Sequence, residues 1–135
     1  MPTLIDTSLL IDFARVRTQR HLKRFIASFI LDPDAHTAEP IVFEVLRHAS
    51  AAEARQLTLQ FQTLPILATP PMLWTLATDL GQQCRHNNIT VNSLDLLIAT
   101  IAMQHGAEVV TFDDDFAKIA SVSNLLVKLL KRPVP

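Results

Sequence analysis

Short stretches typical of buried strands alternate along the chain with longer segments whose apolar residues recur at helical spacing. The strand-like stretches are residues 3–6 (TLID), 35–38 (AHTA), 65–68 (PILA) and 108–111 (EVVT), with a possible fifth at 125–130 (LLVKLL). Helices are expected over residues 7–13, 20–30, 41–49 and 50–64, from Pro70 through Cys84, and over 93–106. Strands that alternate with helices predict a parallel sheet covered on both faces.

Two of the expected helices need further argument. Residues 50–64 alternate like a strand at some positions, but the Ala-rich sequence AAEA at their start favours a helix. The helix that begins at Pro70 carries an apolar stripe, which we expect to bury the thiol of Cys84 and to place Trp74 in packing beside it. Pro40 suits the first turn of a helix, and Gly106 suits the position that ends one.

The fold class that follows is α/β, a three-layer α/β/α sandwich with a parallel sheet of four or five strands. With 135 residues, the chain has the length of one domain, so we expect residues 1–135 to fold as a unit. One cysteine allows no intramolecular disulfide, which suits a reducing compartment. Without a basic leader or a run of ~20 apolar residues, we expect a soluble, cytoplasmic protein that does not enter membranes.

The net charge of −1 gives no indication that the protein binds nucleic acid. Basic residues nevertheless cluster between Arg15 and Arg24, and again between Lys128 and Arg132. Such clusters are most often solvated helix faces, and a rim that contacts phosphates is the alternative. The apolar fraction of 49% against only 19% charged residues predicts an exposed apolar patch, which is typical of an interface.

Acidic residues stand at informative places in this pattern. Asp6 and Asp113 each follow a predicted strand and precede a helix, and Asp95 lies in the first turn of another. Helix capping explains each of them alone. It does not explain Glu44, which lies among apolar residues inside a predicted helix and therefore faces either an exposed edge or a polar pocket.

A shared pocket is plausible because functional residues of open parallel sheets gather beyond the carboxyl ends of the strands. Two carboxylates ~5 Å apart repel by about 3 kcal/mol at an effective dielectric constant of ~20. Four together would cost on the order of 10 kcal/mol, which is comparable with the whole stability of a domain. They must protonate, spread apart or bind a cation, and oxygen ligands without histidine or cysteine favour Mg²⁺ or Mn²⁺.

Four segments in this order strongly resemble the PIN-domain family, and most closely its VapC-type toxins. They are LIDTSLLID (4–12), FEVLR (43–47), SLDLLIATIA (93–102) and VVTFDDDF (109–116). The resemblance implies a Mg²⁺- or Mn²⁺-dependent endoribonuclease that cleaves RNA with a metal-activated water. By position, it implies the catalytic acids Asp6, Glu44, Asp95, Asp113 and Asp115, with Asp6, Asp95 and Asp113 as metal ligands and Ser8 and Thr111 in support. His48 departs from many relatives, which have glycine there.

The resemblance also implies partners: an RNA substrate, a VapB-type antitoxin whose tail blocks the acids, and a second copy in a homodimer. Three alternatives remain open. One is a PIN-fold RNA-processing nuclease without a toxin role, and another is a catalytically silent binding module on the same fold. The third is a phosphoaspartate enzyme or receiver, which the serine at position 8 and the absence of a lysine after the late strand disfavour.

Overall fold

The computed structural model describes all residues, 1–135, and contains one sheet of four parallel strands. The strands are β1 (Thr3–Ile5), β2 (Ala35–His36), β3 (Glu108–Thr111) and β4 (Leu126–Leu129), in the spatial order β2-β1-β3-β4. In the centre of the sheet Leu4 pairs with Val109, and Val109 pairs in turn with Val127. The parallel α/β sandwich predicted from the sequence is therefore confirmed, with four strands.

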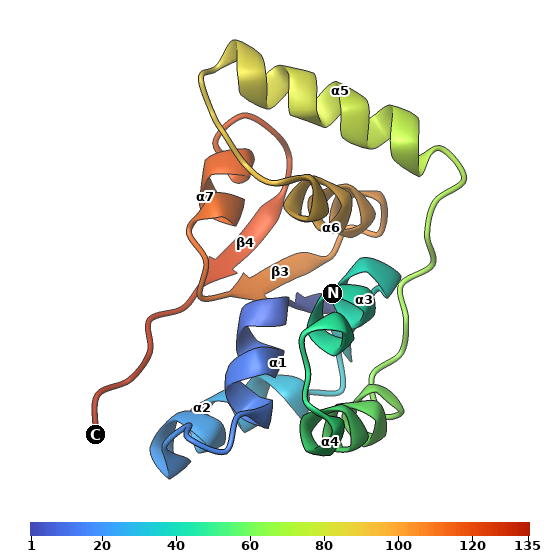
Figure 1. Ribbon diagram of the computed structural model, residues 1–135. Helices are drawn as coiled ribbons and strands as arrows, with labels where there is room; N and C mark the ends of the chain where they lie inside the picture. The colour runs from blue at the N-terminus through green and yellow to red at the C-terminus, as the bar shows by residue number, and fades with distance from the viewer.

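Seven helices surround this sheet. They are α1 (Thr7–Ala14), α2 (Arg20–Ile30), α3 (Glu39–Arg47), α4 (Ala51–Phe61), α5 (Leu73–His86), α6 (Ser93–Gln104) and α7 (Asp115–Ala120). Figure 1 shows α5, α6 and α7 on one side of the sheet and α1 and α2 on the other, with α4 beside α1. Helix α3 contacts both α1 and α6, so it joins the two helical layers at one end of the sheet.

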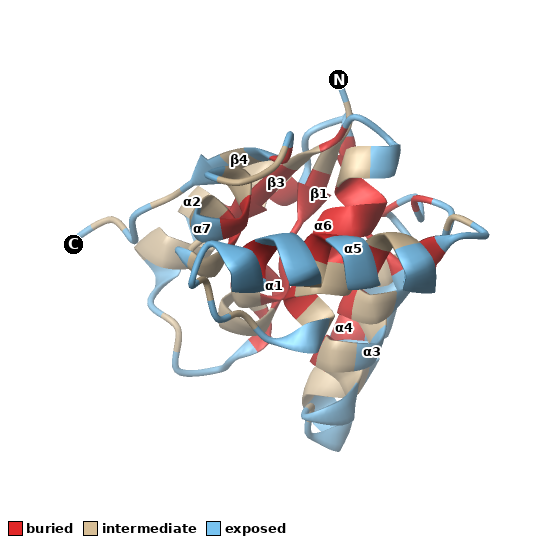
Figure 2. Ribbon diagram, turned by 90° about the horizontal axis from the view of Figure 1, so that it is seen from above, coloured by how far each residue is buried: buried red, intermediate tan, exposed pale blue.

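Helix α6 explains why residues 93–106 are almost entirely apolar. It lies between the sheet and α5, and the run from Ile98 to Ala102 is buried on every side. Figure 2 shows this burial in α6 and the inner strands, whereas the outward face of α5 is exposed. A single cluster of 27 buried apolar residues connects both layers, so the strands and the helices share one core.

Residues 65–68 do not form the predicted third strand. They make only one parallel bridge, between Ile66 and Thr37, in which the Thr37 amide donates to Pro65 and the Leu67 amide donates to Thr37. Proline at position 65 has no amide hydrogen to extend the ladder. The segment is therefore a short extension beside β2, while the possible strand at 125–130 is formed as β4.

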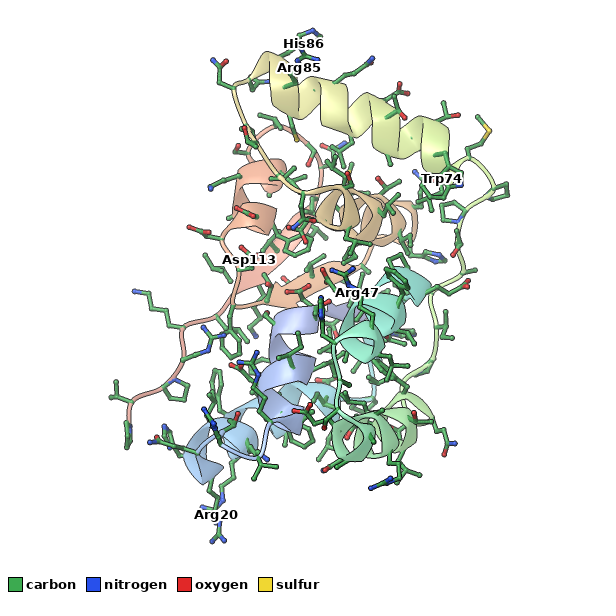
Figure 3. The ribbon with its side chains drawn as sticks, in the orientation of Figure 1. Arg20, Arg47, Trp74, Arg85, His86 and Asp113 are labelled. Atoms are coloured by element: carbon green, nitrogen blue, oxygen red, sulfur yellow. The ribbon has the colours of Figure 1, made fainter.

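Other sequence predictions need smaller corrections. Trp74 does not pack beside the apolar stripe of α5, since 71% of its surface is exposed and Figure 3 labels it near the start of that helix. The helix itself begins at Leu73 rather than at Pro70. Cys84 is buried as predicted, and residues 51–61 are helical. None of the helices is long and apolar enough to cross a membrane.

Candidate metal centre

Four of the acids singled out in the sequence line one cavity of about 260 Å³ at the carboxyl ends of β1 and β3. They come from different parts of the chain: Asp6 after β1, Glu44 in α3, Asp95 in the first turn of α6, and Asp113 after β3. Figure 3 shows Asp113 in the loop beneath α7. We call this space the acid-lined cavity.

Asp6 is the N-cap of α1. Its carboxylate is buried, and one of its two oxygens accepts several hydrogen bonds. Its Oδ2 accepts hydrogen bonds from the Ser8 hydroxyl (2.9 Å), the Ser8 amide (3.3 Å) and the Thr111 hydroxyl (2.8 Å). Burial raises the pKa of Asp6, while the hydrogen bonds from Thr111 and Ser8 oppose that shift. Capping is thus real for Asp6, but it uses only one of the two carboxylate oxygens.

The same two hydroxyls fix the loop between β3 and α7. Thr111 Oγ1 accepts a hydrogen bond from the Asp113 amide (2.8 Å), and Ser8 Oγ accepts one from the Phe112 amide (3.1 Å). Each hydroxyl therefore donates to Asp6 and accepts from the loop. This arrangement, which we call the hydroxyl bridge, ties the start of α1 to the loop that carries Asp113.

Asp95 has a different environment. It is 4% exposed, and its own helix is capped by Asn92, whose Oδ1 accepts from the Asp95 amide (2.8 Å). The Asp95 carboxylate caps nothing, and its buried Oδ2 has no hydrogen-bond partner. Burial raises the pKa of Asp95 to about 7, and the surrounding carboxylates add to the shift. A buried carboxylate oxygen without a partner is costly unless a ligand satisfies it.

Asp95, Asp113 and Asp115 form the group best placed for a cation. One carboxylate oxygen from each lies within 4.8 Å of the other two. Ligand oxygens on opposite sides of one Mg²⁺ are about 4.2 Å apart, so only a small movement is needed to enclose an ion. The residues thus fit a hard divalent cation by donor type, by spacing and by the unsatisfied oxygen of Asp95.

The structure also separates the three consecutive aspartates. Asp113 Oδ1 accepts from the Asp115 amide (2.9 Å), and Asp115 makes an exposed ion pair with Lys118 (3.2 Å). Asp114 occupies the N-cap position of α7, is exposed, and makes no capping hydrogen bond. Two of the three acids therefore belong to the metal-binding group, and Asp114 does not.

Glu44 faces the acid-lined cavity from α3 and is half-buried. The Thr7 hydroxyl donates to its Oε1 at 2.6 Å, which fixes the carboxylate toward α1. The structure therefore places Glu44 in a polar pocket and not on a solvated edge. Its Oε2 is free of hydrogen bonds from other side chains.

Sequence reasoning missed three residues of this site. Thr7 orients Glu44, Asn92 caps α6 beside Asp95, and His48 lines the cavity. Asn92 had a signal, because an Asn three residues before an Asp is typical of a helix start. Thr7 had none, since its role depends on how α1 and α3 pack. His48 ends α3 at a φ of −104°, so the turn there does not require glycine.

Comparisons with known proteins bear on the fold of this chain. No curated protein matches the chain. One similar solved structure is VapBC2 from Rickettsia felis, bound to a DNA fragment from the promoter. A chain of it superposes on this chain with a TM-score of 0.74 at 13% identity. The match covers 97% of this chain and 100% of that one. VapBC-1 from nontypeable Haemophilus influenzae gives 0.72 at 15% identity, covering 96% and 98%.

A third similar structure is VapBC-5 from Mycobacterium tuberculosis, a member of the VapBC family of toxin–antitoxin systems. Its TM-score is 0.66 at 18% identity, with 96% of this chain and 98% of that chain covered. At these identities the structures establish a shared fold. The family model for the PIN domain matches residues 3–122, which is most of the sequence. The chain therefore belongs to the PIN domain family.

Proposed function

We propose that this protein is a Mg²⁺- or Mn²⁺-dependent endoribonuclease and the toxin of a toxin–antitoxin pair. The observation that carries the proposal is the buried Asp95 Oδ2, which lacks a partner and lies in a group of three carboxylates. Asp95, Asp113 and Asp115 would hold the ion, and Asp6 would contribute the carboxylate oxygen that the hydroxyl bridge leaves free. Such an ion supplies charge stabilisation for the phosphate and acidifies a water molecule.

The chain's own residues prepare the site for that chemistry. Thr7 holds Glu44 at the cavity, where the free carboxylate oxygen can accept a proton from the attacking water and orient it toward the scissile phosphate. The hydroxyl bridge keeps Asp113 at a fixed distance from Asp6. No serine, threonine or cysteine nucleophile is needed, because water attacks directly.

The toxin role and the partners rest on similarity. The three solved structures named above are VapBC complexes, and one is described as bound to promoter DNA. We propose a VapB-type antitoxin for this chain as well, in the cytoplasm, together with a homodimer. Large exposed apolar side chains, including Phe43, Ile66 and Trp74, supply surface for such contacts.

Purified protein incubated with RNA tests the nuclease, with Mg²⁺, with Mn²⁺ and with EDTA as separate arms. We expect cleavage with either metal and none with EDTA or in Asp95→Asn. A metal concentration of ten times its dissociation constant should also stabilise the fold by about 1.4 kcal/mol, which thermal melting detects without any substrate. A melting temperature that ignores millimolar Mn²⁺ would contradict the metal site.

Expression in a bacterial host tests the toxin role separately. The wild-type protein should slow growth, Asp95→Asn should not, and co-expression of its VapB-type antitoxin should restore growth. An active nuclease that leaves growth unchanged would favour an RNA-processing enzyme on the same fold.

A further inference from the structure

The two basic clusters of the sequence meet on one side of the molecule. Residues 130–135, which follow β4, run beside α2 (Figure 1), and Nε2 of His21 donates to the carbonyl oxygen of Pro133 (3.2 Å). Nζ of Lys128, in β4, lies 5.3 Å from the centre of the Phe29 ring in α2. The fold therefore brings basic residues of α2 next to those at the end of the sheet. We call the surface made by three of them the basic face: Arg24, Lys128 and Arg132.

Arg132 is held on two sides. Its Nε donates to Oδ2 of Asp12 in α1 (2.8 Å), and its guanidinium carbon lies 4.4 Å from the centre of the Phe112 ring. Half of the side chain is exposed, and its two Nη groups form no hydrogen bond within the chain. A guanidinium whose orientation is already fixed loses little entropy on binding, and its planar donors match the oxygens of a phosphate.

Arg132 also lies beside the acid-lined cavity. Both residues that hold it are neighbours of residues that line this cavity: Phe112 directly precedes Asp113, and Asp12 directly follows Ile11. One end of the basic face therefore borders the carboxylates, at the place where a scissile phosphate would bind.

The other two cations of the basic face form no ion pair. Arg24 and Lys128 are both exposed, and neither contacts a carboxylate. Arg24 lies one helical turn after His21, so it lies on the side of α2 that faces residues 130–135. Lys128 rests over an aromatic ring, which attracts the ammonium group without neutralising its charge. With Arg132, the basic face carries three positive charges and forms one ion pair within the chain.

We propose that the basic face binds backbone phosphates of the RNA substrate next to the cleavage point, with Arg132 on the phosphate nearest the acid-lined cavity. The inference rests on the proposed function. A strand that is cut internally continues past the scissile phosphate, so it crosses the surface that borders the cavity. Cations on that surface offset the repulsion between the strand and the carboxylates. Double-stranded DNA is the competing polyanion, but only a strand that is cleaved must occupy the cavity and its border together.

Binding of a labelled single-stranded RNA to an Asp95→Asn background tests the proposal. Fluorescence anisotropy is measured over a salt series at constant Mg²⁺, and a double-stranded DNA serves as the second probe. We expect Arg24→Gln with Lys128→Gln to raise Kd for RNA about tenfold at about 0.1 M salt. The slope of log Kd against log salt should flatten by about 1.4, since each phosphate contact to a single strand contributes about 0.7.

Arg132 is tested on its own. Arg132→Gln should raise Kd about fivefold and flatten the slope by about 0.7. Arg132→Lys should keep the slope and recover only part of the affinity, because lysine keeps the charge but lacks the planar fork. If Arg132 only stabilised the loop at Phe112, both substitutions would lower the melting temperature and neither would change the slope.

The matched control is Arg55→Gln with Arg85→Gln. It removes the same charge as the Arg24 and Lys128 pair, from exposed arginines of α4 and α5, and Arg85 lies at the opposite end of the molecule from Arg20 in α2 (Figure 3). We expect this control to change Kd less than twofold. Thermal melting of the two double variants should be similar, because all four side chains are exposed.

The possible failures are distinguishable. If the wild-type protein cleaves RNA but the variants of the basic face bind RNA as the control does, the inference is wrong and the proposed function stands. The same holds if these variants lose affinity for double-stranded DNA and keep it for RNA. If the wild type cleaves no RNA and Asp95→Asn binds none, both proposals fail together.

Discussion

Asp6 and Asp95 are the same residue type at almost the same depth, 3% and 4% exposed, yet their surroundings differ. Asp6 Oδ2 accepts three hydrogen bonds from Ser8 and Thr111, whereas Asp95 Oδ2 accepts none. The fold thus supplies partners for one carboxylate and withholds them from the other. Asp6 therefore has a structural role within the site, whereas the carboxylate of Asp95 is available to bind a ligand.

The largest expected effect is on catalysis by Asp95. Asp95→Asn removes the negative charge of the carboxylate that has no hydrogen-bond partner on Oδ2. We expect RNA cleavage to fall about a thousandfold, because a metal ion contributes several kcal/mol to such a reaction. The metal-free variant should melt at a higher temperature than the wild type, since repulsion and desolvation are relieved.

Asp6→Asn is the matched test of the contrast. It should also impair cleavage, and it should raise the melting temperature of the metal-free protein less than Asp95→Asn does, because the hydrogen bonds from Thr111 and Ser8 oppose the effect of burial on Asp6. Equal stabilisation by both substitutions would show that the hydroxyl bridge contributes nothing specific to Asp6.

The hydroxyl bridge itself is tested by Thr111→Val, which keeps the shape and removes the hydroxyl. Thr111 is fully buried, so the substitution leaves the Asp113 amide without its partner and removes one of the three hydrogen bonds to Asp6 Oδ2. It should destabilise the fold by about 2–3 kcal/mol. Cleavage should fall roughly 10- to 100-fold, as for groups that position metal ligands. Urea unfolding and initial rates measure the two effects. The same change at Thr7, Thr7→Val, should alter the cleavage rate more than the stability, because it removes only the hydrogen bond that holds Glu44.

The acidity of Asp95 predicts how metal-free stability depends on pH. Its pKa is raised to about 7 in the folded protein from 3.8, so the folded state binds the extra proton between these values. Stability from this group is therefore greatest below pH 4 and is lost as the pH rises through 7, by at most about 1.4 kcal/mol per pH unit. Melting in EDTA from pH 5 to 8 should show a fall that Asp95→Asn reduces and that Mg²⁺ opposes. An identical pH profile for wild type and variant would contradict the assignment.

The smallest effect is expected at Asp114. It is exposed and makes no capping hydrogen bond, so Asp114→Ala should change stability by less than about 0.5 kcal/mol and leave cleavage within a few-fold. Asp113→Ala is the comparison, and it should cost far more. Similar losses from the two would mean that the whole acidic run acts as one charge.

The sequence was sufficient to predict the parts of this site that depend on local pattern. Asp6 and Asp113 follow apolar strands, and strands of one parallel sheet bring their ends together, so their proximity could be inferred. The link from Thr7 to Glu44 could not, because it spans 37 positions and depends on helix packing. The prediction of a strand at residues 65–68 was wrong because an apolar run does not reveal whether a neighbouring strand is free to pair. The prediction that Trp74 packs beside the apolar stripe was wrong because helical spacing does not show where the core ends.

The pairing of β1 with β3 has a consequence for synthesis of the protein. Register joins Leu4 to Val109, so the central strand finds its neighbour only after most of the chain has been made. Contacts this distant in sequence slow folding, and they cannot form on a shorter nascent chain. A chain whose translation stops before residue 108 lacks β3, Thr111 and Asp113 together. Interrupted synthesis should therefore release fragments that are inert toward the RNA of the cell that makes them.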